Sequence, residues 1–159
     1  MAEIKTSSID WDGRFLNLAQ LVSSWSKDPS TKVGSVIVDE SRRVISVGYN
    51  GFPKGVRDSQ HRLDDRELKY NFMVHAERNA IIFSRGSLEN STIYTYPFMP
   101  CSHCAGMIIQ SGIKRVVTFY DRNPRWAKSF DISKKMFLEA AVDLTEYNKN
   151  FFLKVDNNF

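Results

Sequence analysis

The chain has 159 residues, a length typical of one domain that buries its own core without disulfide bonds. Apolar residues make up 42% and charged residues 25%, which is typical of a globular protein and excludes a fibrous or disordered chain. No apolar run is long enough to span a membrane, and the first residues lack the apolar stretch of a secretory signal. We therefore expect a single cytoplasmic domain over residues 1–159, without a membrane partner.

Charge and cysteine content narrow the choice of ligands. The formal net charge of +4 suits a phosphate-bearing ligand, although an excess of this size is also common on surfaces that bind nothing. The two cysteines, Cys101 and Cys104, are three residues apart. In a chain without an export signal, this spacing favours metal or redox chemistry over a structural disulfide bond.

The first half of the chain predicts a helix, a hairpin and a long loop. Apolar residues recur at helical spacing from Trp11, which predicts a helix ending near Ser26. Two β-branched runs, residues 33–38 and 44–49, are joined by a short polar turn and predict an antiparallel hairpin. Residues 50–71 carry glycines, a proline and many charges without periodicity, so we expect a loop, and loops of this length are often functional.

The second half of the chain predicts helices that alternate with strands. In order, these are a helix at 75–84, a strand at 92–96, a helix at 101–111, a strand at 115–119, a helix at 131–141 and a strand at 142–144. Alternation after a hairpin indicates a mixed sheet covered by helices on both faces. The predicted fold class is α/β, a three-layer αβα sandwich around a mixed sheet of about five strands. The apolar tail at 151–153 is expected to cover the core or to join a subunit interface.

Two short motifs lie at the predicted starts of two helices. Residues 75–77 are His-Ala-Glu, and residues 100–104 are Pro-Cys-Ser-His-Cys. Together they match H-x-E followed by P-C-x-x-C, the pattern of zinc deaminases. The match is a hypothesis that the geometry of a metal site has to satisfy.

The spacing within the motifs allows one shared metal ion. Residues 75 and 77 point to nearly opposite sides of a helix, so His75 and Glu77 can both face a metal only if it lies beyond the helix end. Cys101 and Cys104 in the first turn of another helix can both face the same ion, and the helix dipole favours their thiolate forms. We therefore expect two helix N-termini to converge on one metal.

Three of these residues are predicted zinc ligands, and the fourth residue is predicted to be catalytic. His75, Cys101 and Cys104 leave the fourth position of a tetrahedral Zn²⁺ for water, as catalytic zinc sites require. Zinc lowers the pKa of bound water from about 15.7 to about 7. Glu77 is then the base that moves a proton from this water to the ring and afterwards to the departing amine of a cytosine.

Other readings of the motifs remain. The cysteine pair could be a redox centre, but this would leave His75 and Glu77 without a shared purpose. A closed structural zinc site would need a fourth ligand, for which His61 and His103 are the remaining histidines, and His103 should point away. A helix-capping role is the alternative for Glu77.

Three further segments resemble the deoxycytidylate deaminase family of the cytidine deaminase superfamily. They are residues 26–34 (SKDPSTKVG), 48–55 (GYNGFPKG) and 110–114 (QSGIK), and the resemblance extends to about Leu144. It implies a cytidine deaminase-like fold, one catalytic Zn²⁺ per chain and deamination of dCMP to dUMP, which supplies thymidylate synthesis. It also implies a homo-oligomer, hexamer or dimer, and no nucleic-acid partner.

The resemblance also implies substrate contacts. Asn50 is expected to help bind the nucleotide, and the backbone at Ala76 to contact the base. The residues expected near the phosphate are Ser26, Lys27 and Thr31, with Lys54 and Arg57 as further candidates. Tyr120 follows a predicted strand where the family often closes its pocket with an aromatic residue. Solvated surface charge is the alternative role for the basic residues. Arg78 replaces an aliphatic residue common in the family, which could retune base or nucleotide selection.

Two other functions compete with a dCMP deaminase. A tRNA adenosine deaminase shares the zinc motif and suits a basic surface, but its relatives usually have a shorter span between the asparagine loop and the histidine than Asn50 and His75 show here. Free cytidine or deoxycytidine is a related option that the upstream segments disfavour. A non-catalytic zinc- or nucleotide-binding scaffold is the other competitor, and Glu77 argues against it because a closed structural site needs no adjacent base.

Overall fold

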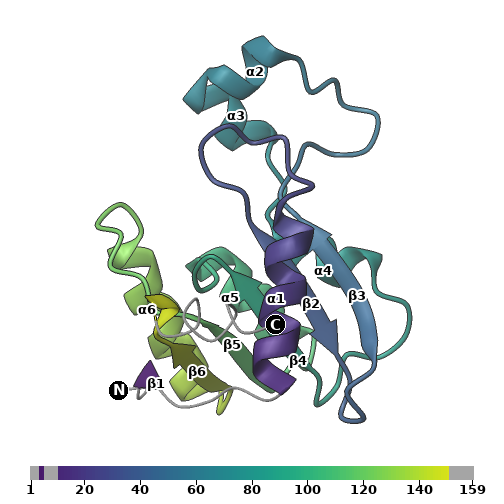
Figure 1. Ribbon diagram of the computed structural model, residues 1–159, viewed down its shortest axis with the longest axis vertical. Helices are drawn as coiled ribbons and strands as arrows, with labels where there is room; N and C mark the ends of the chain where they lie inside the picture. Colours follow the sequence, from purple (N-terminus) through teal and green to yellow (C-terminus); the bar gives the residue numbers. More distant parts are fainter. Residues whose placement is uncertain (1–3, 6–10, 151–159) are drawn as a thin grey trace.

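The described residues form a mixed sheet of six strands, in the order β1-β6-β5-β4-β2-β3 (Figure 1). The computed structural model describes residues 4–5 and 11–150. The strands are β1 (Ile4–Lys5), β2 (Gly34–Val38), β3 (Val44–Tyr49), β4 (Thr92–Tyr96), β5 (Arg115–Phe119) and β6 (Asp143–Tyr147). β2 is antiparallel to β3 and β4, whereas β4, β5, β6 and β1 run parallel to one another. The predicted hairpin and mixed sheet are confirmed, and among the described strands only the two-residue strand β1 was not predicted from the sequence.

The described part of the chain contains six helices. They are α1 (Trp11–Ser23), α2 (Gln60–Asp64), α3 (Arg66–Phe72), α4 (Ala76–Phe83), α5 (Ser102–Gln110) and α6 (Ala127–Glu139). α1 ends before the predicted Ser26, and α6 begins before the predicted Asp131. The earlier start of α6 follows from Phe130, which is buried in the same core cluster as Phe137.

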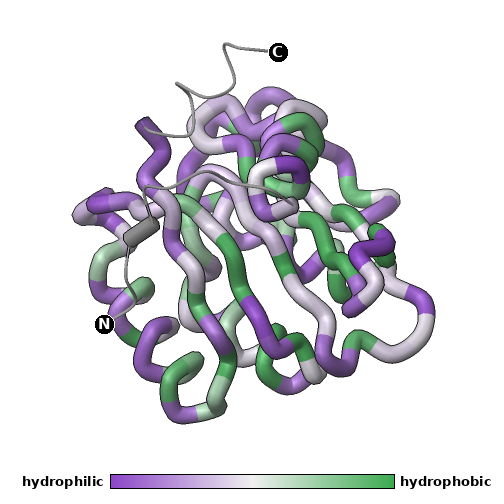
Figure 2. Tube along the Cα trace, turned by 60° about the horizontal axis from the view of Figure 1, so that its bottom comes forward, coloured by the Kyte–Doolittle hydropathy of each residue, from purple (hydrophilic) through white to green (hydrophobic). Residues whose placement is uncertain are grey.

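Side chains that alternate in direction along each strand divide the core between the two faces of the sheet. Val36 and Val38 of β2 face a cluster with α1, whereas Ile37 between them faces a cluster with α4, α5 and α6. The predicted three layers, helix, sheet and helices, are therefore confirmed (Figure 1). Figure 2 shows hydrophobic stretches along the central strands and largely hydrophilic turns at the periphery.

Two glycines bring helices into direct contact with the sheet. A Cβ atom at Gly34 would overlap the backbone of Ala19 in α1. A Cβ atom at Gly48 would overlap the backbone of Ala76 and Ala80 in α4. The absence of a side chain at Gly48 thus lets the first turn of α4 lie directly on β3.

The expectation of a continuous loop over residues 50–71 was wrong. This stretch contains α2 and most of α3, which stand apart from the sheet at one end of the molecule (Figure 1). Asp65 caps α3 by accepting a hydrogen bond from the backbone of Leu68 at 3.0 Å. Both helices are short and mostly polar, so the apolar periodicity that reveals a helix is missing.

No helix of residues 11–150 is long and apolar enough to cross a membrane. The apolar tail predicted to cover the core or an interface, residues 151–153, lies outside the described residues.

Candidate active site

The two motif segments meet at the N-termini of α4 and α5. His75 occupies the position just before α4, and Glu77 lies in its first turn. Cys101 occupies the position just before α5, and Cys104 lies in its first turn. The expected convergence of two helix N-termini is therefore present, and it brings the three predicted ligands together.

The distances among these side chains suit a tetrahedral zinc ion. His75 Nδ1 lies 3.5 Å from Cys101 Sγ and 3.4 Å from Cys104 Sγ. A zinc ion bound to one nitrogen and one sulfur at tetrahedral angle would separate these atoms by about 3.6 Å. Both cysteines are buried and neither forms a disulfide bond. One imidazole nitrogen and two thiols, all within 4.8 Å of one another, form a candidate zinc site.

Electrostatic interactions among these three residues favour a thiolate. The hydrogen bond from Cys104 lowers the pKa of Cys101 to about 3, although burial opposes the shift. The same hydrogen bond, together with burial, raises the pKa of Cys104. The neighbouring Cys101 also raises the pKa of His75. Cys101 therefore ionises more readily than Cys104, and a metal ion that binds both sulfurs requires the loss of both thiol protons.

Glu77 is a buried carboxyl group beside this cluster, with 4% of its surface exposed. Burial raises its pKa above the ordinary value, although the positive charge of His75 opposes the shift. A carboxyl group with a raised pKa exchanges its proton more readily near neutral pH. The environment of Glu77 therefore suits a proton-transfer role.

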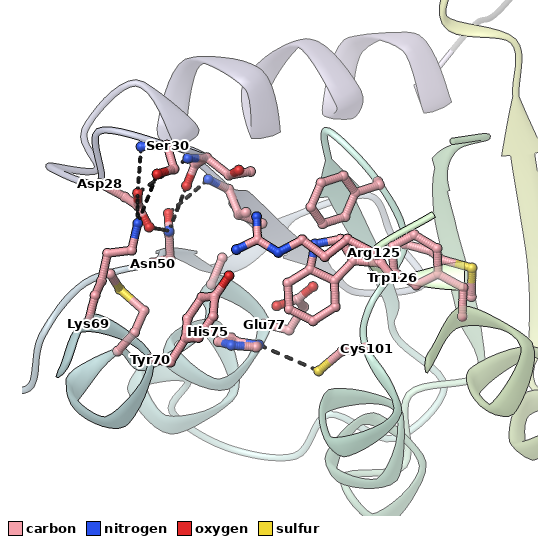
Figure 3. A pocket seen from close by; sticks show the side chains of 17 residues that line it. Asp28, Ser30, Asn50, Lys69, Tyr70, His75, Glu77, Cys101, Arg125 and Trp126 are labelled. Atoms are coloured by element: carbon pink, nitrogen blue, oxygen red, sulfur yellow. Dashed lines mark hydrogen bonds and ion pairs between the residues drawn. The ribbon is translucent and has the colours of Figure 1, made fainter. Parts of the chain in front are cut away.

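A pocket extends from the cluster toward α3 and the segment that precedes β2. Figure 3 shows Asp28, Ser30, Asn50 and Lys69 grouped on one side of this pocket. His75, Glu77 and Cys101 form another part of its lining. The remaining lining residues are Thr31, Val33, Tyr70, Met73, Ala76, Phe98, Met99, Arg125, Trp126 and Phe130.

The residues expected to contact the substrate divide into two groups. Asn50, Ala76 and Thr31 line the pocket. The amide of Asn50 is engaged by the backbone, because its Oδ1 accepts from Val33 N at 2.8 Å and its Nδ2 donates to Thr31 O at 2.9 Å. Asn50 thus holds the segment that precedes β2 in place against the pocket.

The other group does not line the pocket. Ser26 is not among the lining residues, but its Oγ donates to Asn50 O at 2.8 Å and so supports a residue that lines the pocket. Lys27 forms an exposed ion pair with Asp58 at 2.8 Å. Tyr120 accepts a hydrogen bond from Arg122 Nε at 2.9 Å. Lys54 and Arg57, the two further phosphate candidates, are likewise not among the lining residues.

A buried ion pair in the pocket wall was not predicted from the sequence. Lys69 Nζ donates to Asp28 Oδ1 at 2.9 Å and to Ser30 Oγ at 3.0 Å. Lys69 belongs to α3, which the sequence pattern did not reveal. A lysine within a charged stretch gives no signal of burial, so only the fold could identify this pair.

Phe98, Trp126 and Phe130 form an aromatic wall opposite the group around Asn50, and these residues were also not predicted from the sequence. The ring of Phe98 lies 6.4 Å from that of Trp126 and 5.5 Å from that of Phe130, measured between centroids. The guanidinium of Arg125 lies 5.3 Å from the ring centre of Tyr70. The aromatic residues just before Pro100 were a partial signal, whereas nothing in the sequence pattern connects Tyr70 with Arg125.

Two serines of α6 hold the backbone on either side of Cys101. Ser133 Oγ donates to Pro100 O at 2.9 Å, and the backbone N–H of Ser102 donates to Ser129 Oγ at 2.9 Å. Ser129 and Ser133 are one helical turn apart, so one face of α6 fixes the segment that carries a candidate ligand. Supporting hydrogen bonds of this kind orient the ligands of metal sites.

Comparisons with known proteins agree with this geometry. A family described as the cytidine and deoxycytidylate deaminase zinc-binding region matches residues 9–120. An uncharacterized deaminase from the luxG 3′ region of Aliivibrio fischeri is 46% identical over 85% of this chain and 92% of its own length. A probable deoxycytidylate deaminase of Caenorhabditis elegans is 46% identical over 81% of this chain and 66% of its own length.

A solved structure supports the fold. The dCMP deaminase of the cyanophage S-TIM5, in its apo form, has a TM-score of 0.69 at 22% identity and covers 88% of this chain and 99% of its own. The family match over residues 9–120 and the two relatives at 46% identity confirm the resemblance inferred from residues 26–34, 48–55 and 110–114. The chain belongs to the zinc-binding cytidine and deoxycytidylate deaminase family.

Proposed function

We propose that this chain hydrolyses dCMP to dUMP and ammonia, which makes dUMP available for thymidylate synthesis. The observation that carries the proposal is the buried Glu77 beside the cluster of His75, Cys101 and Cys104, at a pocket with both polar and aromatic walls. The name of the nematode relative supports dCMP as the substrate. A purely structural zinc site would need no buried carboxyl group next to its ligands.

The residues of the pocket have separate roles in this reaction. His75 through Nδ1 and the two cysteines through Sγ hold Zn²⁺, which, when bound, supplies the Lewis acidity that makes water a nucleophile at neutral pH. Glu77 accepts a proton from the attacking water and delivers it to N3 of the pyrimidine. It then takes the second proton from the hydroxyl group that the water has formed at C4 and delivers it to the 4-amino group. The C4–N4 bond breaks, a carbonyl remains at C4, and ammonia leaves.

The rest of the pocket positions the nucleotide. The backbone at Ala76 contacts the base, and Thr31 and Asn50 lie along the wall that the nucleotide follows. The apolar rings of Phe98, Trp126 and Phe130 limit the access of bulk water to the reacting carbon. Ser26 acts indirectly, by supporting Asn50.

Product analysis with competing substrates tests the proposal. Ammonia and the nucleotide product are measured after incubation of zinc-loaded protein with dCMP, dCTP, deoxycytidine and a tRNA hairpin. Selective conversion of dCMP to dUMP is the expected result. Deamination of adenosine in the hairpin would replace the proposal with a tRNA deaminase, and no turnover at one zinc per chain would leave a binding scaffold.

We also propose that the protein is a homo-oligomer, a dimer or hexamer. Large apolar side chains are exposed near the edge strand β3: Trp25 (51% exposed), Tyr49 (41%), Ile82 (62%) and Phe83 (57%). Exposed apolar side chains near a sheet edge are typical of subunit contacts. Sedimentation equilibrium tests this expectation, and a monomer at micromolar concentration would contradict it.

A further inference from the structure

Arg125 provides a positive charge to the pocket, and its role is not explained by the chemistry above. Its guanidinium lies over the ring of Tyr70, which comes from α3 on the other side of the pocket. We propose that Arg125 binds the 5′-phosphate of the substrate and thereby makes the enzyme prefer a nucleotide to a nucleoside. This inference rests on the proposed deamination of dCMP and assigns one residue to substrate selection.

The charges that line the pocket leave Arg125 available. The charge of Lys69 is compensated by Asp28 at 2.9 Å, and both side chains are almost fully buried. Glu77 also lines the pocket, but it is an acidic residue and does not attract a phosphate. Within residues 11–150, Arg125 has no carboxylate partner, and its side chain contacts the rings of Tyr70 and Trp126. An arginine stacked on a ring keeps the N–H groups at its edge free to donate to phosphate oxygens.

Backbone and ring contacts place Arg125 at the pocket before a ligand arrives. The N–H of Arg125 donates to Asn123 Oδ1 at 3.0 Å, which fixes the turn that leads into α6. Tyr70 holds the guanidinium from the other side at 5.3 Å. In Figure 3 the Arg125 side chain extends across the pocket, between the group around Asn50 and Trp126. A cation held in this way loses little conformational freedom on binding.

The basic residues expected near the phosphate from the sequence do not face the pocket. Lys27 is paired with the exposed carboxylate of Asp58, and Lys54 lies over the ring of Phe83. Arg57 is likewise not among the lining residues. Arg125 therefore fits the phosphate role better than any of these three.

The experiment compares two substrates that differ only in the phosphate. Values of kcat/KM for dCMP and deoxycytidine are measured for the unchanged protein, Arg125→Ala and Arg125→Lys. Lys128→Ala is the matched control, because Lys128 carries the same charge, is exposed on α6 and does not line the pocket. Loss of hydrogen bonds to a charged group predicts that Arg125→Ala lowers kcat/KM for dCMP about 10- to 100-fold. The value for deoxycytidine should stay within about threefold.

The outcomes separate the inference from the proposed function. The inference is supported if Arg125→Ala lowers kcat/KM for dCMP but not for deoxycytidine. Arg125→Lys should then have an intermediate kcat/KM for dCMP, and Lys128→Ala should have the value of the unchanged protein. It is overturned if the unchanged protein deaminates dCMP and Arg125→Ala either keeps the same kcat/KM for dCMP or lowers kcat/KM for dCMP and deoxycytidine equally. If the unchanged, zinc-loaded protein deaminates no form of cytosine, the proposed function fails and the inference falls with it.

Discussion

Lys69 Nζ and Asp28 Oδ1 lie 2.9 Å apart, with only 4% and 8% of their side chains exposed. Asp28 also accepts hydrogen bonds from the backbone of Ser30 and Thr31. This ion pair therefore connects α3 to the segment that lines the pocket before β2. The connection joins residues 41 positions apart in the sequence.

Removal of the lysine should destabilise the protein, because it leaves a buried carboxylate without its partner. We expect Lys69→Met to lower the free energy of unfolding by about 3 kcal/mol. Urea denaturation measures this change. Lys27→Met is the control: its ion pair with Asp58 has a similar length but is exposed, so no measurable loss is expected. Equal stabilities of Lys69→Met and Lys27→Met would show that burial of the Asp28 pair contributes nothing.

Replacement of Glu77 should separate metal binding from catalysis. Glu77→Gln keeps the shape of the side chain but cannot take up a proton as a carboxylate does. We expect turnover of dCMP to fall about 100- to 10,000-fold, the usual contribution of a positioned acid and base. Atomic absorption should still find one zinc per chain. Full turnover in this variant would assign the proton transfer to another group.

The serines of α6 should influence zinc affinity without touching the ion. Ser133 is fully buried, and its replacement by alanine leaves the carbonyl before Cys101 without this hydrogen bond. We expect Ser133→Ala to weaken zinc binding about 10-fold, measured by competition with a chelator. Ser111→Ala is the control, because Ser111 also donates to a backbone carbonyl of α5, but at the far end of the helix. If both variants bind zinc as tightly as the unchanged protein, the hydrogen bond to Pro100 does not support the ligand.

Asp12 should make stability depend on acidic pH. Burial alone would raise the pKa of Asp12, but hydrogen bonds from Arg115, Tyr147 and Tyr94 outweigh it and lower this pKa below the ordinary value. A carboxyl group with a lowered pKa in the folded state stabilises the fold above its unfolded pKa of about 3.9. This contribution is lost as the pH falls from that value through the folded pKa.

Asp12→Asn tests this dependence. We expect the variant to be about 2 kcal/mol less stable at pH 7, and the difference to shrink as the pH falls below about 4. Chemical denaturation at a series of pH values measures both effects. Asp131→Asn, an exposed change on α6, should leave the pH profile unaltered. A difference for Asp12→Asn that stays constant down to pH 2 would contradict the assigned shift.

The sequence predicted the parts of the fold that repeat a simple pattern. The β-branched runs at 33–38 and 44–49 became the buried strand β2 and the partly exposed strand β3, because β-branched side chains pack well in a sheet. The convergence of His75 with Cys101 and Cys104 was predictable, since metal ligation constrains both spacing and helix ends. The roles of these residues and of Glu77 stay predictions until the variants are measured.

The sequence did not reveal the parts that depend on distant contacts. α3 is too short and too charged to show a hydrophobic period, and its burial at Lys69 depends on Asp28. Arg125 precedes α6 in a turn, where side-chain direction follows no period. Basic residues in and near the family-like segments at 26–34 and 48–55 were predicted to lie near the phosphate. In the fold, Lys27 instead forms an ion pair with Asp58.

The position of α2 and α3 outside the three layers also bears on how this protein can evolve. The sheet and its flanking helices carry the reactive residues, whereas α3 carries Lys69 and Tyr70 on the wall that a ligand meets. Changes in length or sequence between Gly55 and Phe72 can therefore alter which ligand binds, while the reactive residues keep their positions. The same catalytic scaffold can in this way acquire new substrates through one peripheral segment.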